Sequence, residues 1–180
     1  MKKLKHIAMA MTALTIAGAA GAQTMTDSGY YAEIGYTPLE IKFDNIKLKP
    51  NLVRLVVGKD VHENLAIDAM AATTIAKDTQ SIQGIELKTS ATAYGLYLKP
   101  KVALTKDTEL FMRFGYVNTQ LKFEGSSSMY STGNDSSASY GIGITTKFSK
   151  DVYGGLDYVT YYSKDGINIS GLTASIGVRF

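Results

Sequence analysis

The sequence has no cysteine and no tryptophan, and only two histidines and three prolines among its 180 residues. Without cysteine the chain can form no disulfide, and no lipid can be attached to an N-terminal cysteine. After Ala22, no stretch approaches the ~18 consecutive apolar residues of a membrane-spanning helix. Any segment of the mature chain that crosses a membrane must therefore be a β-strand.

The N-terminus has the three parts of a secretory signal. Lys2, Lys3 and Lys5 form a basic start, an apolar stretch runs from residue 7 to 19, and Ala20-Gly21-Ala22 is a small-residue cleavage site. We therefore predict a signal peptide over residues 1–22 and a single mature domain over 23–180, with a retained anchor as the alternative. Cleavage removes three of the 19 basic residues and none of the 16 acidic ones, so the mature chain is formally neutral. This charge balance predicts no nucleic-acid partner.

The mature chain repeats a period-two pattern of apolar residues, which is the pattern of β-strands. We predict eight strands, at residues 29–37, 51–58, 64–75, 84–104, 108–124, 137–148, 152–163 and 168–180. Short connections (58–63, 105–107, 149–151) alternate with long ones (38–50, 76–83, 125–137), except that the last connection, 163–166, is short. This alternation predicts an all-β fold: an eight-stranded antiparallel up-and-down transmembrane β-barrel.

Each predicted strand has one uncharged apolar face and one face that carries charges and glycines. The apolar set includes Thr160 and Tyr162 in the seventh strand and alternate residues from Leu172 to Phe180 in the last. In the fourth and fifth strands the apolar face becomes polar beyond Tyr94 and Tyr116, at the place expected for an aromatic girdle. This height limit, and glycines that share a face with charges as in a narrow lumen, predict that the apolar face contacts lipid. Pro100 predicts a bulge in the fourth strand.

Six charged residues fall three to six positions from the short-turn ends of their strands, on the glycine-bearing face. The predicted lumen layer consists of Glu33, Arg54, Asp68, Lys99, Arg113 and Asp157. Three acids balance three bases, which favours an ionic plug that fills a narrow eight-stranded lumen. A selectivity filter or gate is the functional alternative.

The signal, the eight-strand meander, the neutral mature chain and the terminal Phe180 together resemble the small outer-membrane β-barrel proteins of the OmpA/OmpX type. The resemblance implies export through the periplasm to the outer membrane, among outer-membrane lipid and lipopolysaccharide. It also implies that the last strand is an assembly signal for the barrel-insertion machinery. Thr173, Val178 and Phe180 match that signal, whereas Ser175 stands where a glycine is usual.

The sequence contains no pattern that predicts a catalytic, cofactor or metal site. His6 leaves with the signal, His62 falls in a predicted turn, and no His/Cys/carboxylate spacing suits a metal. We therefore expect a non-enzymatic protein with a structural or surface-interaction role. Loops 76–83 and 125–137 are its candidate ligand surface, although 125–137 also suits a solvated tether. The alternatives are a small passive channel, an outer-membrane enzyme, and a soluble lipocalin-like binder, which would lack its usual Gly-x-Trp.

Overall fold

The computed structural model describes residues 29–43, 46–82, 85–124, 129–164 and 166–180. The predicted signal peptide, residues 1–22, lies outside them. Among the described residues no helix is long and apolar enough to span a membrane. The strands are β1 (Tyr30–Phe43), β2 (Ile46–Leu48), β3 (Asn51–His62), β4 (Leu65–Ala76), β5 (Asp78–Ile82), β6 (Ile85–Ala103), β7 (Thr108–Glu124), β8 (Met129–Lys147), β9 (Val152–Lys164) and β10 (Ile167–Arg179).

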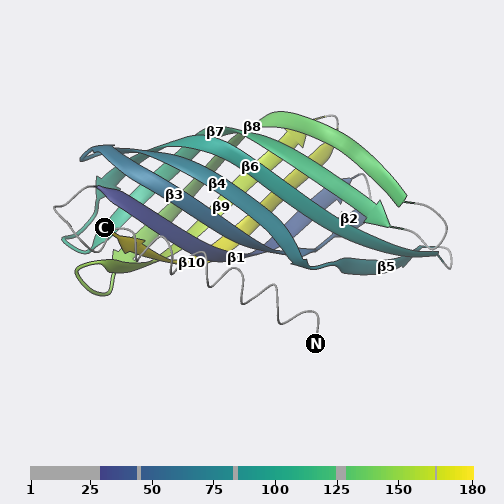
Figure 1. Ribbon diagram of the computed structural model, residues 1–180, viewed down its shortest axis with the longest axis horizontal. Helices are drawn as coiled ribbons and strands as arrows, with labels where there is room; N and C mark the ends of the chain where they lie inside the picture. Colours follow the sequence, from purple (N-terminus) through teal and green to yellow (C-terminus); the bar gives the residue numbers. More distant parts are fainter. Residues whose placement is uncertain (1–28, 44–45, 83–84, 125–128, 165) are drawn as a thin grey trace. The chain divides into compact units, whose positions relative to one another are not determined.

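Eight of these strands form a closed antiparallel barrel (Figure 1). Each long strand pairs with the next one along the chain, and β10 pairs back onto β1 from Tyr31↔Arg179 to Phe43↔Ile167. The two short strands lie at one end, where β2 folds back on β1 and β5 runs beside β6. The predicted eight-stranded up-and-down barrel is confirmed. Its short turns, at 63–64, 104–107 and 148–151, define the turn end, and the opposite end is called the loop end.

Several predicted strand limits are wrong at the loop end. Segment 38–50, predicted as a loop, contains the last part of β1 and all of β2, and segment 76–83 contains β5. In the same way β8 begins at Met129, so most of the serine-rich segment 125–137 is strand; its residues 125–128 lie outside the described part. The predicted turn 58–63 is also too long, because β3 continues to His62. The strands therefore run well beyond the predicted apolar band.

The predicted bulge at Pro100 is wrong. The β6–β7 register is the same on both sides of it, at Leu98↔Phe114 and at Lys101↔Phe111. Pro100 still pairs with Leu65 of β4. The missing N–H of proline interrupts the β6–β7 ladder without inserting an extra residue.

The outward face of the barrel carries an apolar band that ends in a ring of tyrosines toward the loop end. Within the band Leu96, Leu98 and Phe114 are each at least half exposed, as side chains that face lipid would be. The ring consists of Tyr36, Tyr94, Tyr116, Tyr140 and Tyr158, which are 48–63% exposed. Such a girdle marks the membrane–water interface, because a phenol ring has an apolar body and a polar tip.

Beyond the tyrosine ring the polarity of the wall is inverted. Outward positions are polar, such as Lys42 on β1 and Gln120 on β7, whereas Leu39, Ile41 and Leu121 point inward and are buried. These inward residues belong to an apolar core that also contains Leu48, Leu52, Tyr161, Tyr162 and Ile169. The loop end is therefore built like a water-soluble barrel, with an apolar interior, on top of a membrane barrel.

A bulge in β9 places two consecutive tyrosines inside the barrel. The β9–β10 register shifts between Tyr162↔Ile169 and Thr160↔Ser170, so Tyr161 is left unpaired in this ladder. An extra residue reverses the alternation of the faces. Tyr162, predicted to face lipid, is in fact 7% exposed and belongs to the apolar core. The prediction for Tyr162 is wrong because a uniform period of two cannot anticipate a bulge. Thr160, which lies before the bulge, stays in register with the outward Tyr140, but it is covered and only 6% exposed.

Glycines leave room for the tyrosine rings that cross the lumen near the turn end. A Cβ atom at Gly58 would overlap the ring of Tyr31, and one at Gly177 would overlap the ring of Tyr153. The two rings also meet edge to face, with centroids 6.4 Å apart. This explains why the glycines share a face with the long charged and aromatic residues.

The polarity inversion gives a topological prediction. A cysteine in place of Gln120, which is four residues beyond Tyr116 toward the loop end, should react with a membrane-impermeant maleimide added to intact cells. A cysteine in place of Leu98, inside the apolar band, should be protected by lipid. The mass shift of the protein measures the extent of labelling at each position. Equal protection at the two positions would contradict the assigned orientation, in which the short turns face the periplasm.

Candidate functional site

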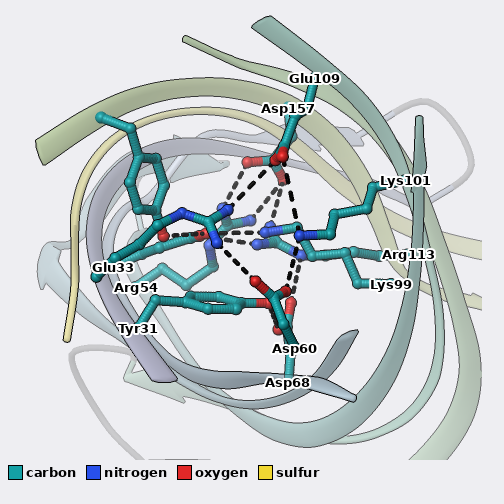
Figure 2. A network of polar contacts seen from close by, with 12 residues as sticks. Tyr31, Glu33, Arg54, Asp60, Asp68, Lys99, Lys101, Glu109, Arg113 and Asp157 are labelled. Atoms are coloured by element: carbon teal, nitrogen blue, oxygen red, sulfur yellow. Dashed lines mark hydrogen bonds and ion pairs between the residues drawn. The ribbon is translucent and has the colours of Figure 1, made fainter. Parts of the chain in front are cut away.

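The six charged residues predicted for the lumen layer are brought together by the structure (Figure 2). Each comes from a different strand of the barrel, and each is 4% exposed or less. They point inward because successive side chains of a strand alternate between its two faces. The residues next to each of them in the chain face outward. The members are Glu33 of β1, Arg54 of β3, Asp68 of β4, Lys99 of β6, Arg113 of β7 and Asp157 of β9.

Arg113 is the centre of this layer. Its guanidinium donates from Nη2 to Glu33 Oε2 at 2.7 Å, from Nε to Asp68 Oδ2 at 2.9 Å, and from Nη1 to Asp157 Oδ2 at 3.3 Å. One cation therefore links three acids on three other strands. Arginine can do this because its planar group carries five N–H donors in a fixed arrangement.

The remaining donors complete the pairing. Arg54 binds Asp157 with two parallel hydrogen bonds of 2.5 and 2.7 Å, and Lys99 Nζ donates to Glu33 Oε1 at 3.0 Å. Every oxygen of the three carboxylates accepts at least one hydrogen bond when the tyrosine donors described next are included. The layer is electrically neutral and its acceptors are satisfied, which offsets the high cost of moving the charges out of water.

Two tyrosines belong to the layer although the sequence analysis did not include them. The Tyr31 hydroxyl donates to Asp68, and the Tyr153 hydroxyl donates to Glu33 Oε1 at 3.0 Å. Tyr31 also lies under the Lys99 ammonium, whose distance to the ring centroid is 4.7 Å. Only their positions in the sequence could have indicated this. Tyr31 stands two residues before Glu33, and Tyr153 four residues before Asp157, in each case on the same face of the strand.

A second neutral network lies nearer the turn end. Lys101 Nζ binds Asp60 at 2.8 Å, and Arg179 binds Asp60 at 2.6 Å and Glu109 at 3.3 Å. These side chains are 6–25% exposed, so water reaches this network more readily than the layer above. Sequence reasoning missed it because Asp60 was assigned to a turn, and because partners on β3, β6, β7 and β10 are far apart in the chain.

The lumen is also filled on the loop side of the ionic layer. Met70, Tyr97, Val159 and Tyr161 line a space that has no room for a water molecule. Beyond it lies the apolar core of the loop end. The ionic network near the turn end, the layer of six charges and the apolar core of the loop end therefore follow one another along the lumen.

Sequence reasoning singled out no catalytic or metal-binding residue, and the described part of the structure adds no candidate metal cluster. No group of three or more His, Cys, Asp or Glu side chains there could hold a metal ion. His62 is exposed beside the turn after β3, where its Nδ1 accepts a hydrogen bond from the Asn64 N–H at 3.3 Å. The six charged residues of the lumen layer are all engaged in ion pairs with one another.

The residues assigned to the assembly signal lie on both faces of β10. Thr173 is buried in the lumen, where its hydroxyl oxygen is 2.8 Å from that of Thr37 across the β1–β10 seam. Val178 is 39% exposed on the outward face, opposite Ala32. Recognition of Thr173, Val178 and Phe180 by an insertion machinery stays a prediction.

The pairing in the layer predicts a large effect of Arg113→Met, which keeps the volume but removes the central cation. The free energy of unfolding in detergent micelles should fall by about 3–5 kcal/mol, because buried carboxylates lose their partner. Lys106→Met, which removes an exposed cation from a turn, should leave the free energy of unfolding almost unchanged. Adding Glu33→Gln to Arg113→Met should recover part of the loss. Urea midpoints read from unheated gels measure all three, and equal midpoints for the two single variants would contradict the pairing.

The solved structures similar to this chain include three barrels that have TM-scores of 0.59 to 0.70. Neisserial surface protein A matches with a TM-score of 0.70 at 11% identity, covering 85% of this chain and 98% of that one. The attachment invasion locus protein Ail of Yersinia pestis, in complex with the heparin analogue sucrose octasulfate, matches with 0.64 at 18% identity, covering 84% and 97%. The N-terminal β-barrel domain of Pseudomonas aeruginosa OprF matches with 0.59 at 10% identity, covering 83% and 97%. At these identities the likeness concerns the fold.

The sequence itself carries the family relationship. No curated protein sequence matches the chain. Residues 9–180, however, match the family described as outer membrane protein beta-barrel domain, and this range includes every strand of the closed barrel. The lipid-facing band and the tyrosine ring are the features that a barrel in the outer membrane presents to its lipid. The chain belongs to the outer membrane protein beta-barrel domain family.

Proposed function

We propose that this chain is a non-enzymatic outer-membrane protein that acts through surface interactions at its loop end, on a barrel that does not conduct ions. The observation that carries the proposal is that the molecule is divided into a filled barrel and a group of strands that project from its loop end. The lumen is occupied by paired charges and apolar side chains, while β6, β7 and β8 continue far beyond the tyrosine ring. Export through the periplasm with signal 1–22, and insertion by the barrel assembly machinery, belong to the same proposal.

The projecting strands offer open edges to a partner. In the described residues β8 pairs with β9 only from Tyr140 to Lys147, so Met129–Ser139 is hydrogen-bonded through its main chain to β7 alone. Likewise β5 pairs only with β6. Exposed strand edges bind extended segments of other proteins by adding a strand. This supports a partner that docks at the wall formed by β5 to β8.

Side chains hold the open edge of β8 near β9 without pairing the backbones. The Tyr162 hydroxyl donates to Asp135 Oδ2 at 2.6 Å, and the Ser136 N–H donates to Asp135 Oδ1 at 2.8 Å. The hydrogen bond from Tyr162, followed by that from Ser136, lowers the pKa of the Asp135 carboxyl. The edge is thereby kept in a defined position while its main-chain groups stay available.

The names of two similar structures agree with such a role. One is a surface protein, and the other is an attachment invasion locus protein solved with a heparin analogue. An interaction with sulfated glycans or with host surfaces is therefore a reasonable first class of ligand to test for this chain. The segments 76–83 and 125–137, which contain β5 and the first part of β8, are where we expect such a ligand to bind.

A filled lumen predicts that the purified protein is electrically silent. Protein reconstituted into a planar bilayer should give no steady conductance, because paired charges and a space too small for water block the path. The positive control is Arg113→Ala in the same chain, which removes the central cation of the layer and should open intermittent leaks. A stable, ion-selective conductance of the unmodified protein would make the passive channel the better assignment.

Shortening the projecting wall should remove the surface interaction but keep the barrel. We expect cells that express the intact chain to adhere to heparin-coated or host-cell-coated surfaces more than cells without it. A variant in which residues 123–130 are replaced by Asn-Gly, a two-residue turn suited to hairpins, should lose this adhesion. Heat-modifiable gel mobility checks that the barrel is intact. If cells that express the intact chain adhere to every tested surface no better than cells without the protein, the proposal is contradicted.

A further inference from the structure

One lysine interrupts the apolar face that the barrel presents to lipid. Between the turn end and the tyrosine ring, the outward positions of the described strands carry a single charged side chain, Lys59 of β3. The residues two positions to either side of it, Val57 and Val61, are apolar and are 55% and 49% exposed. A cation on the lipid face costs free energy, and the cost rises with its depth in the bilayer. The ammonium of Lys59 therefore needs a counter-charge or water.

The described part of the chain offers Lys59 no acidic partner. The adjacent Asp60 points into the lumen, where it binds Lys101 and Arg179, and none of the ion pairs among the described residues involves Lys59. The ammonium instead donates to the Tyr30 hydroxyl oxygen at 3.0 Å and lies 4.5 Å from the centroid of the Tyr30 ring. An ammonium carries three N–H donors, so this contact leaves two of them for a ligand and leaves the charge without a counter-charge.

The height of Lys59 decides which leaflet it meets. It stands opposite Tyr30 in the β1–β3 register, and Tyr30 is six residues from Tyr36 of the tyrosine ring. Six residues span roughly 15 Å along the membrane normal at ~3.3 Å per residue and a tilt of ~40°. In a band ~25 Å tall, Lys59 is therefore in the part nearer the turn end, and its four-carbon stem lets the ammonium extend toward the headgroups there. Because the short turns face the periplasm, these are headgroups of the periplasmic leaflet.

The surface between Lys59 and the middle of the band suits an acyl chain. Lys59 pairs with Ile67 of β4, and the next outward residue of β4 toward the loop end is the exposed Ala69. Ala69 stands between two larger outward residues, Val57 of β3 and Leu96 of β6, which are 55% and 65% exposed. A chain that lies on the small Ala69 therefore contacts apolar side chains on both sides, and each such contact adds dispersion energy.

We propose that Lys59 and the apolar surface beside it bind an anionic phospholipid of the periplasmic leaflet. The phosphate accepts hydrogen bonds from the Lys59 ammonium, which Tyr30 holds in position. The acyl chains lie against Val57, Ala69 and Leu96. A phosphodiester without an ammonium of its own suits this site, because the site has one cation and no acidic partner. The proposal concerns the opposite end of the barrel from the proposed function, and it requires only that the barrel lies in the outer membrane.

The experiment counts the phospholipids that stay bound to the folded protein. Protein in nanodiscs that contain equal amounts of phosphatidylglycerol and phosphatidylethanolamine is transferred to a mild detergent, and native mass spectrometry counts each bound lipid. Lys59→Met removes the ammonium and keeps an apolar stem that suits the lipid face, whereas Lys59→Arg keeps a cation. Lys106→Met removes an exposed lysine of a short turn and is the control. Heat-modifiable gel mobility checks that every variant is folded.

The unmodified protein, Lys59→Arg and the control should retain phosphatidylglycerol in preference to phosphatidylethanolamine. Lys59→Met should retain phosphatidylglycerol at least about fivefold less, as expected for the loss of a lysine beside an anionic headgroup. Equal retention by Lys59→Met and Lys106→Met would overturn the proposal, and so would equal retention of the two lipids by the unmodified protein. A dimer of the unmodified protein that Lys59→Met abolishes would also overturn it, because the counter-charge would then come from a second copy. None of these results depends on adhesion at the loop end.

Discussion

Closure of the sheet at the β1–β10 seam is the constraint on which the rest of the structure depends. In hydrocarbon there is no water to satisfy a free N–H or C=O group, so a strand can cross only if both of its edges are paired. The pairing of β10 with β1 from Tyr31↔Arg179 to Phe43↔Ile167 removes the last open edge within the band. Below the tyrosine ring every long strand has two neighbours, and open edges occur only beyond it, where water is available.

Closure with eight strands also dictates what fills the interior. An eight-stranded barrel leaves space for side chains and little more. Because the outer face must be apolar for lipid, the polar residues of the strands are directed inward and must neutralise one another there. Arg113, bound to Glu33, Asp68 and Asp157, meets this requirement together with Arg54 and Lys99. The absence of a side chain at Gly58 and Gly177 leaves room for Tyr31 and Tyr153 to cross the lumen.

The tyrosine ring divides the barrel into two parts whose polarity is opposite because their solvents differ. In the lipid part the outer face is apolar and the inner face polar, whereas in the water part Leu39 and Ile41 point inward and Lys42 and Gln120 outward. The second part is where surface function can reside, since its outer face meets headgroups and its strand edges meet water. The ionic layer belongs to the first part and stabilises the scaffold.

The sequence by itself determined the barrel, its lipid face and the six charged residues of the ionic layer. These follow from a period of two, which is a local property, together with the need to keep charge out of lipid; Glu33 and Asp157 could be placed in one layer simply by counting from the turns. Tertiary structure alone decided the partners. Nothing in the chain says that Arg113 binds three acids or that Asp60 meets Arg179, because these contacts join strands that closure brings together across the lumen. It also decided the inward rotation of Tyr162, which depends on a bulge against β10, and the strands of the loop end, where the change of solvent reverses the pattern that identified the others.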